Sequence, residues 1–546
     1  MSIDITVECQ IPAITQAQPP KPLEPLEIVD DASPGQNQAA EDESQYPTGL
    51  AKFLIIASVT LAYVLTSMDS TIVSVVVPSL TDEFHTTRDI GWYSSAYRLC
   101  VCSFQFMFGK LYKMLPVEMI FLTSVVVFMI GSVLCATANT STAFVVGRAV
   151  CGFAASAIMA GGLALLVLCV PMRKRPLYTG IVGAASGVSG IASPMLGGAI
   201  VDGIGWRWCF WITLPLAGVT LVALFFCLPK SEARERLTWK QHFSELDPLG
   251  TACFVASLTC LFLAFSWAGS KYAWNSPVII GLLVAFGGLL VLFGLDQWKK
   301  GESATLPPRI LRNRSVLSGF VFTLFTNSAT MVILYYLPTY FQVVRGSTAA
   351  QSGYYQIPAI AGDIIGVTLQ STGVTVIGYY TPFMWAGTIL MPLLAGLLTT
   401  VKVRTALASV LVMTEFFGFA GGIGFLSPQS AVQMALPKAD ANIGLSIILF
   451  AEQFGAALFV SAAQNIFQTR LKGNLQMAVP QLNATSIESV GLSDLKTLVD
   501  PWDMGAVLEA VDKSVAQTWY LAVGLACLTI VGSATMEWRS VKEKRH

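Results

Sequence analysis

The sequence predicts an all-α polytopic membrane protein with fourteen transmembrane helices. Only 12% of the 546 residues are charged and 54% are hydrophobic, whereas soluble domains are roughly 25% charged. The mean hydropathy is +0.63. Apolar runs follow one another from residue 52 onwards, each close to the ~20 residues that cross a bilayer. A chain of this composition is typical of a protein whose helices lie mostly in lipid.

The apolar runs form a series with two long connections, at 229–247 and 468–516. The spans are expected at 52–77, 90–110, 118–137, 143–169, 177–200, 207–228, 248–267, 277–297, 315–341, 353–373, 380–400, 406–434, 441–467 and 517–536. Residues 1–51 precede them as an acidic tail. Nine acidic residues stand against Lys21 in its first 47 positions, and its prolines, among them Pro19, Pro20, Pro22, Pro25 and Pro34, favour disorder.

Lysine and arginine indicate the orientation of the spans. With both termini in the cytoplasm, 21 of the 33 basic residues fall on the cytoplasmic side and 10 on the other. Arg98 and Arg148 lie within spans. Because cytoplasmic loops carry the excess of positive charge, this orientation is preferred. Asn483, in a sequon within the loop 468–516, is then external and a candidate for glycosylation.

Several classes of protein are excluded or disfavoured by the sequence. A net charge of zero argues against nucleic acid as a partner. The span count excludes a seven-helix receptor, and no phosphate-binding GxxxxGK[ST] loop occurs. Neither HExxH, a nucleophile elbow, clustered histidines nor a CxxC pair is present, so we expect no enzyme, no cofactor and no metal site.

Several ionisable residues lie inside spans, where charge is costly and therefore a functional candidate. The six away from the span ends are Asp69, Arg98, Arg148, Asp363, Glu415 and Glu452. At ~1.5 Å per residue, the first three share the outer half of the N-terminal spans and the last three lie near the midplane of the C-terminal ones. An Asp69–Arg98 ion pair is predicted, which leaves Arg148 freer to meet an anionic or carbonyl-rich substrate; the alternative is that Arg98 extends to the interface. The carboxylates are candidates for carrying protons.

The fifth span carries Gly187, Gly190, Pro194, Gly197 and Gly198. Small residues allow close helix packing, and proline permits a bend. This face either only packs helices together or also keeps two groups of helices sealed as they move against each other.

Six short segments resemble the fourteen-span drug:proton antiporter branch of the major facilitator superfamily, and some resemble fungal toxin and secondary-metabolite exporters. They are 68–73 (MDSTIV), 109–112 (GKLY), 147–152 (GRAVCG), 187–198 (GVSGIASPMLGG), 206–210 (WRWCF) and 336–342 (YLPTYFQ). The resemblance links Arg148 and Asp69 to proton coupling and the fifth span to export. The chain departs from the pattern at Ser193, where glycine is usual, and at Arg98, where an apolar residue is usual.

The resemblance implies the major facilitator fold, with two six-helix bundles and two extra helices. The N-terminal bundle is expected at 52–228, the linker with the extra pair at 229–314 and the C-terminal bundle at 315–536, followed by a cytoplasmic tail at 537–546. A cavity between the bundles and alternating access come with this fold.

The function implied is proton-coupled efflux of a small amphipathic drug, toxin or metabolite by a monomer in the plasma membrane, or in a vacuolar or vesicle membrane. The partners implied are a small-molecule substrate, protons and the lipid bilayer. An importer of a nutrient or siderophore on the same fold, and a non-transporting sensor, are the alternatives.

Overall fold

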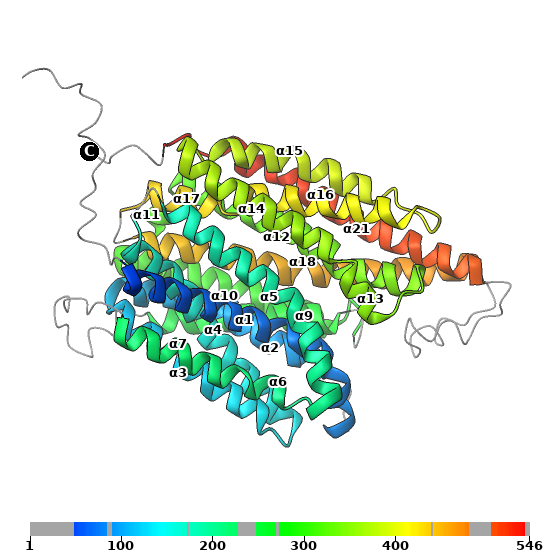
Figure 1. Ribbon diagram of the computed structural model, residues 1–546, viewed down its shortest axis with the longest axis horizontal. Helices are drawn as coiled ribbons and strands as arrows, with labels where there is room; N and C mark the ends of the chain where they lie inside the picture. The colour runs from blue at the N-terminus through cyan, green and yellow to red at the C-terminus, as the bar shows by residue number, and fades with distance from the viewer. Residues whose placement is uncertain are drawn as a thin grey trace, which may run out of the picture. The chain divides into compact units, whose positions relative to one another are not determined.

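The computed structural model describes residues 49–84, 90–171, 174–227, 247–268, 272–437, 440–479 and 504–540. Every regular element in these ranges is helical, and the helices run side by side (Figure 1). The expected acidic tail up to residue 48, and Asn483 with its sequon, lie outside the described residues.

The N-terminal helices form one packed group. They are α1 (Gly49–Phe84), α2 (Ile90–Met114), α3 (Val117–Ala136), α4 (Ser141–Cys169), α5 (Arg175–Ile204), α6 (Trp208–Trp211) and α7 (Thr213–Cys227). Helix α1 packs against α5 and α7, and α4 packs against α2 and α3. Helices α6 and α7 together make one span.

The C-terminal helices form a second group. They are α12 (Arg314–Thr339), η4 (Tyr340–Val344), α13 (Ala349–Tyr354), α14 (Ile357–Ile377), α15 (Thr381–Leu398), α16 (Leu407–Phe425), α17 (Ser427–Ala435), α18 (Ala441–Ala478) and α21 (Met504–Thr535). Helix α12 packs against α18 and α21, and α16 packs against α14 and α15. The two groups meet where α2 contacts α18 and where α5 contacts α14.

Thirteen helices among the described residues are long and apolar enough to cross a membrane. Helix α2 is the remaining expected span. It is less apolar because Arg98, Gln105, Lys110 and Lys113 lie along it, yet its 25 residues reach ~38 Å at 1.5 Å per residue, enough to cross a bilayer. Its polar residues are accommodated because α2 lies between α4 and α18.

The last two helices are longer than the apolar pattern predicts. Helix α18 continues to Ala478 and α21 begins at Met504, so both ends of the expected loop 468–516 are helical. Asn474 Nδ2 donates to Ser514 Oγ at 2.8 Å and to Gln517 Oε1 at 3.1 Å. Polar contacts of this kind hold the two helices together beyond their apolar stretches.

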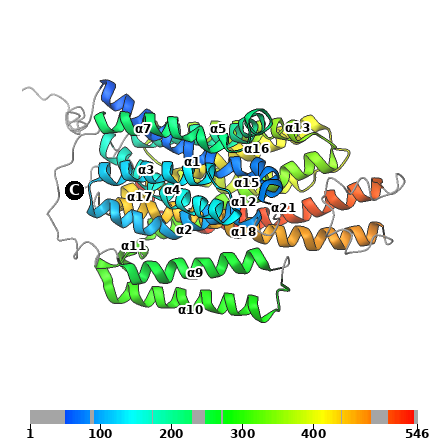
Figure 2. The same cartoon turned by 90° about the horizontal axis from the view of Figure 1, so that it is seen from below.

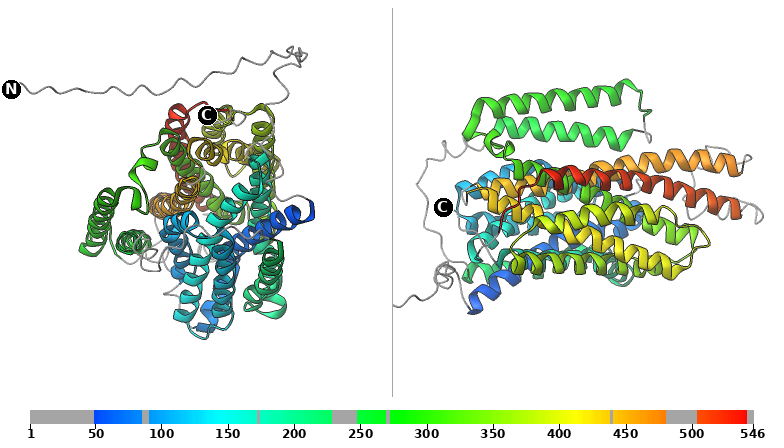
Figure 3. Two further views of the ribbon diagram at one scale, coloured as in Figure 1. Left: turned by 90° about the vertical axis from the view of Figure 1, so that its left-hand side faces the viewer. Right: turned by 90° about the horizontal axis from the view of Figure 1, so that it is seen from above.

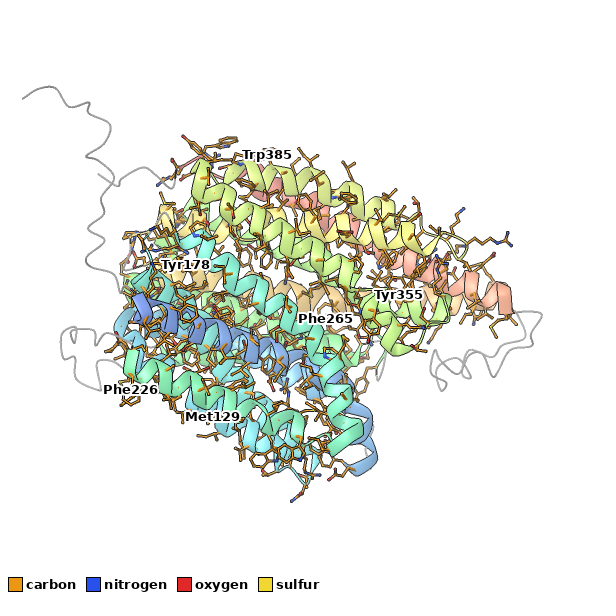
Figure 4. The ribbon with its side chains drawn as sticks, in the orientation of Figure 1. Met129, Tyr178, Phe226, Phe265, Tyr355 and Trp385 are labelled. Atoms are coloured by element: carbon orange, nitrogen blue, oxygen red, sulfur yellow. The ribbon has the colours of Figure 1, made fainter. Side chains whose placement is uncertain are left out.

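The outer surface of the helices is apolar. Phe226 of α7 is 79% exposed and projects away from the neighbouring helices (Figure 4). Val284 of α10 (Pro277–Lys300) and Leu393 of α15 are exposed in the same way. In water such a surface would be unfavourable, but in a bilayer it faces hydrocarbon.

The extra helix pair covers the seam between the two groups. Helices α9 (Pro248–Trp267) and α10 lie together along one side of the other helices (Figures 2 and 3), and α9 contacts both α2 and α18. Three rings meet there: Phe254 of α9 lies 5.2 Å from Phe106 of α2 and 5.6 Å from Phe450 of α18, between ring centroids. Aromatic packing therefore anchors the pair to both halves at once.

A buried carboxylate fixes the start of this pair. Asp247, at φ 54°, caps α9 by accepting a hydrogen bond from Gly250 N at 2.8 Å. It also accepts from Gln297 and Lys300 of α10. Although burial opposes ionisation, these hydrogen bonds lower the pKa of Asp247 to about 2.

Candidate functional site

A cavity of about 460 Å³ lies between the two helix groups. One wall comes from α1, α2, α4 and α5, and the other from α12, α13, α14, α16, α17 and α18. A volume of this size is in the range of small-molecule sites. Because both groups contribute a wall, a change in their relative position changes the cavity.

Three of the six predicted intramembrane charges line this cavity. Arg98 comes from the α2 wall, and Asp363 and Glu452 come from α14 and α18 on the opposite wall. Among the described residues, none of the three makes an ion pair. The cavity therefore holds one cationic and two acidic side chains on opposing walls.

Asp69 and Arg148 form a buried ion pair behind the cavity wall. Arg148 Nη1 lies 2.6 Å from Asp69 Oδ2, and both side chains are 0% exposed. Arg148 Nε also donates to the Tyr93 carbonyl at 3.1 Å. Asp69 Oδ1 and Arg148 Nη2 have no hydrogen-bond partner within the described ranges. Breaking a buried pair strands a charge, so this contact ties α1, α2 and α4 together.

This pairing replaces the Asp69–Arg98 pair expected from sequence. Depth along the helices placed all three residues at a similar level, but depth says nothing about helix rotation. Tyr97 faces the pair, with the Arg148 guanidinium 4.5 Å from its ring centroid. Arg98 follows one residue later, ~100° further around the helix, and so faces the cavity. Arg148, which was expected to be the freer of the two arginines, is therefore the one that forms the ion pair with Asp69.

Interlocking glycines fix the position of Asp363. A Cβ on Gly418 of α16 would lie 1.7 Å from the Ala359 carbonyl oxygen of α14, and a Cβ on Gly422 would lie 2.2 Å from that of Asp363. Gly362 and Gly366 of α14 approach the α16 backbone just as closely. Small residues spaced four apart on both helices allow this contact, and it holds the Asp363 backbone rigidly at the cavity wall.

Glu452 lies in the first half of α18, beside two amide side chains. Its backbone carbonyl accepts from Asn327 Nδ2 of α12 at 2.6 Å, and its Oε1 accepts from Gln453 Nε2 at 3.3 Å. Asn327 and Gln453 also line the cavity. The α18 wall thus offers a carboxylate with neighbouring hydrogen-bonding groups.

Glu415 occupies a different place from the one expected. It was predicted to lie with Asp363 and Glu452 near the midplane of the interior, but its side chain is exposed on α16 and does not line the cavity. The neighbouring Phe416 is also exposed. Gly418, three residues further along, faces α14 and takes the interior position on that helix.

The fifth predicted span, α5, is joined to α1 by three serines. Ser67 Oγ donates to the Ser186 carbonyl at 2.8 Å, Ser189 Oγ to Val64 at 2.9 Å and Ser193 Oγ to Met68 at 2.9 Å. Ser193, which departs from the glycine of the resembling motif, therefore makes a specific helix–helix hydrogen bond. Neither the motif nor residue spacing indicated these three partners.

The small residues of α5 divide into two groups. Gly187, Gly190 and Pro194 line the cavity, and a Cβ on Gly187 would meet nothing within 4 Å. Gly197 is close to α1, because its Cβ would lie 2.7 Å from Ile72 Cγ1, whereas the Cβ of Gly198 would lie 3.9 Å from Val75 Cγ1. Part of the predicted packing face therefore shapes the cavity.

At one end the two helix groups are in contact. This is the end that holds α17 and α11 (Pro308–Leu311), on the left of Figure 1. A Cβ on Gly109 of α2 would lie 2.2 Å from Ser446 Oγ of α18, and one on Gly180 of α5 would lie 2.2 Å from Ser371 Oγ of α14. Lys113, in the last turn of α2, also contacts the other group, with its Nζ 2.7 Å from Asp440 Oδ1.

Comparison with known proteins agrees with this architecture. Residues 59–460 match the model of the Major Facilitator Superfamily. The chain is 40% identical over 513 residues to the MFS-type efflux pump MFS1 of Trichophyton rubrum, covering 93% of this chain and 96% of that one. It is 38% identical over 510 residues to the efflux pump aflT of Aspergillus parasiticus, covering 93% and 99%.

Solved structures show the same fold at low sequence identity. A double tryptophan mutant of XylE superposes with a TM-score of 0.58 at 14% identity, covering 90% of this chain and 96% of that one. The human organic anion transporter MFSD10 superposes with a TM-score of 0.56 at 13% identity, covering 87% and 99%. The family match, the similar relatives and the cavity between two helix groups agree: this chain belongs to the major facilitator superfamily.

Proposed function

We propose that this protein exports small amphipathic molecules, such as fungal toxins or other secondary metabolites, by proton-coupled secondary transport. The cavity between the two halves carries the proposal, because it combines an apolar lining with two carboxylates, Asp363 and Glu452, that make no ion pair with any described residue. The relatives named efflux pumps, at 38–40% identity over nearly their full length, support export rather than uptake. Transport, and not catalysis, is the activity assigned to the cavity.

Protons are proposed to be the coupling ion. A carboxylate facing a poorly hydrated cavity is costly to ionise, so it can hold a proton when the cavity faces one side and release it when it faces the other. Asp363 and Glu452 serve as the carriers, while Asp69 and Arg148 join the N-terminal helices that move as a unit. Glu415, on the outer surface of α16, is not given this role.

The unit of transport is proposed to be a monomer, because both walls of the cavity come from one chain. The plasma membrane, with both termini in the cytoplasm, is the proposed location. The end closed by Lys113 and Asp440 then faces the cytoplasm.

Transport by the purified protein in liposomes tests the proposal. Liposomes that are acidified inside, with the cytoplasmic face of the protein outward, should accumulate rhodamine 6G, a fluorescent amphipathic dye, against its gradient. A protonophore should stop the accumulation. The reversed pH gradient should drive the dye out. Uphill accumulation with only the reversed gradient would contradict export, and dye movement that ignores both gradients would contradict proton coupling.

A further inference from the structure

Arg98 is a cation in the cavity wall that makes no ion pair or hydrogen bond with any part of the chain that the structure describes. We infer that Arg98 binds an oxygen acceptor of the substrate, a carbonyl or a phenolate, and so selects amphipathic molecules that carry such a group at one end. The inference rests on the proposed function, because it assumes that the cavity receives the transported molecule.

No carboxylate of the described residues forms an ion pair with this guanidinium. Asp69, the nearest candidate expected from sequence, is bound to Arg148 at 2.6 Å and is fully buried. Asp363 and Glu452 belong to the opposite wall and make no ion pair with Arg98. The donors of Arg98 are thus available to a molecule in the cavity.

The chemistry of the side chain determines what it can bind. A guanidinium has five N–H donors and no acceptor, and its planar fork suits paired oxygens. A half-buried guanidinium that faces an apolar cavity has lost part of its hydration, and an acceptor on the ligand compensates that loss. A ligand group that only donates hydrogen bonds gains nothing at this wall.

The rest of the cavity suits the apolar body of such a molecule. Val101 lies one helical turn from Arg98 on α2, and Met159 and Leu163 of α4 line the same wall. Met331 and Leu334 of α12 line the opposite one. A fused-ring molecule placed between these side chains can direct a carbonyl or phenolate oxygen to Arg98.

Two probes with the same ring system separate the acceptor from the apolar body. 2-Hydroxyanthraquinone and 2-hydroxyanthracene share three fused rings and a hydroxyl, but only the first has ring carbonyls. Dissociation constants are measured on the full chain in lipid nanodiscs, with no pH gradient, for the unmodified protein and for Arg98→Leu, Arg98→Lys and Arg312→Leu. Arg312→Leu is the matched control because it removes an exposed arginine that lies outside the cavity, 5.7 Å from the Trp298 ring centroid.

The unmodified protein should bind the anthraquinone more tightly than the anthracene. Arg98→Leu should weaken anthraquinone binding about tenfold or more, the effect of losing a hydrogen bond to a charged group, and leave anthracene binding unchanged. Arg98→Lys should restore part of the preference, and Arg312→Leu should keep all of it. Equal losses for both probes, no preference, or no binding of the anthraquinone to the unmodified protein would overturn the inference.

The same preparations keep the two proposals apart. Loss of gradient-driven dye transport with an intact Arg98-dependent preference for the anthraquinone would refute the proposed function alone. Intact gradient-driven transport without that preference would refute the assignment of Arg98 alone.

Discussion

Lys113 of α2 and Asp440 before α18 join the two halves of the protein, with Nζ 2.7 Å from Oδ1. The other oxygen of the same carboxylate accepts from Arg309 Nη2 of α11 at 2.7 Å. One aspartate of the C-terminal half thus holds a basic residue of the N-terminal half and another of the linker. Burial opposes its ionisation, yet the hydrogen bonds from Lys113 and Arg309 keep the pKa of Asp440 below its ordinary value of 3.8.

Asp440→Asn should loosen this end of the molecule, because it removes the charge that both basic residues share. Spin labels at the exposed positions Met119 and Leu317, one in each half, should show a broader and longer distance distribution by pulsed electron resonance. Glu302→Gln is the control: Glu302 is 66% exposed where it contacts Arg309, and surface pairs contribute little.

Because the pKa of Asp440 is lowered on folding, its contact with Lys113 should hold above pH 3.8 and be lost only as the pH falls through the lowered value. Unchanged distances in Asp440→Asn would show that helix packing alone keeps the end closed.

Substitutions at Asp69 and Arg148 should have non-additive effects on the free energy of unfolding, whereas substitutions at Asp69 and Arg98 should have additive ones. Asp69→Asn should destabilise the protein by about 3–5 kcal/mol, the cost of stranding a buried charge, and Arg148→Leu by a similar amount. The double substitution should cost less than the sum of the two. Thermal unfolding in detergent measures this cycle. Asp69→Asn combined with Arg98→Leu is the comparison and should be additive; coupling there instead would indicate that Asp69 exchanges between the two arginines.

Removal of both cavity carboxylates should uncouple transport from the proton gradient. Asp363→Asn with Glu452→Gln should lose uphill transport and keep downhill exchange, because the amides cannot take up or release a proton. Glu415→Gln, outside the cavity, should behave like the unmodified protein in the same liposome assay. Full uphill transport by the double variant would refute the two carriers, and a loss confined to Glu415→Gln would return the role to that residue.

The α14–α16 contact should tolerate no side chain at Gly418. Gly418→Ala would place a Cβ 1.7 Å from a backbone oxygen, so the helices must separate and the protein should lose folded yield. Gly396→Ala is the matched control, since a Cβ at that position on α15 meets nothing within 4 Å. Size-exclusion chromatography of the two fluorescently tagged variants measures the difference. Equal monodisperse peaks would mean that the pair can move apart at little cost.

Glycan mapping should establish the orientation. Asn483 lies in a sequon on the expected external side and should carry a glycan. Asn313, whose Oδ1 caps α12 by accepting from Ser315 and Val316 N, should be bare on the cytoplasmic side. Mass spectrometry of glycopeptides from a eukaryotic host measures whether each site carries a glycan, and Asn483→Gln should remove the glycopeptide expected from the external loop. A glycan on Asn313 would reverse the orientation.

The sequence by itself determined the class of the protein and the order of its long apolar helices. Apolar length is a local property: about twenty residues cross a bilayer wherever they occur, so the spans and the membrane class could be predicted from composition and run length, whereas the division into two bundles and an extra pair came from the resemblance to a known family. The rarity of charge in lipid singled out Asp69, Arg98, Arg148, Asp363, Glu415 and Glu452 in the same way.

Only the tertiary structure decided which of these charges meet. The partner of a side chain depends on the rotation of its helix about its own axis, and neighbouring spans fix that rotation through contacts far apart in the sequence. Tyr97 and the glycine contacts of α14 and α16 therefore determine that Arg148 is paired, that Arg98 and Asp363 face the cavity, and that Glu415 does not. Helices in lipid are apolar on several faces at once, so their sequences carry little amphipathic signal from which rotation could be read. Close packing of small residues and individual hydrogen bonds supply that information instead.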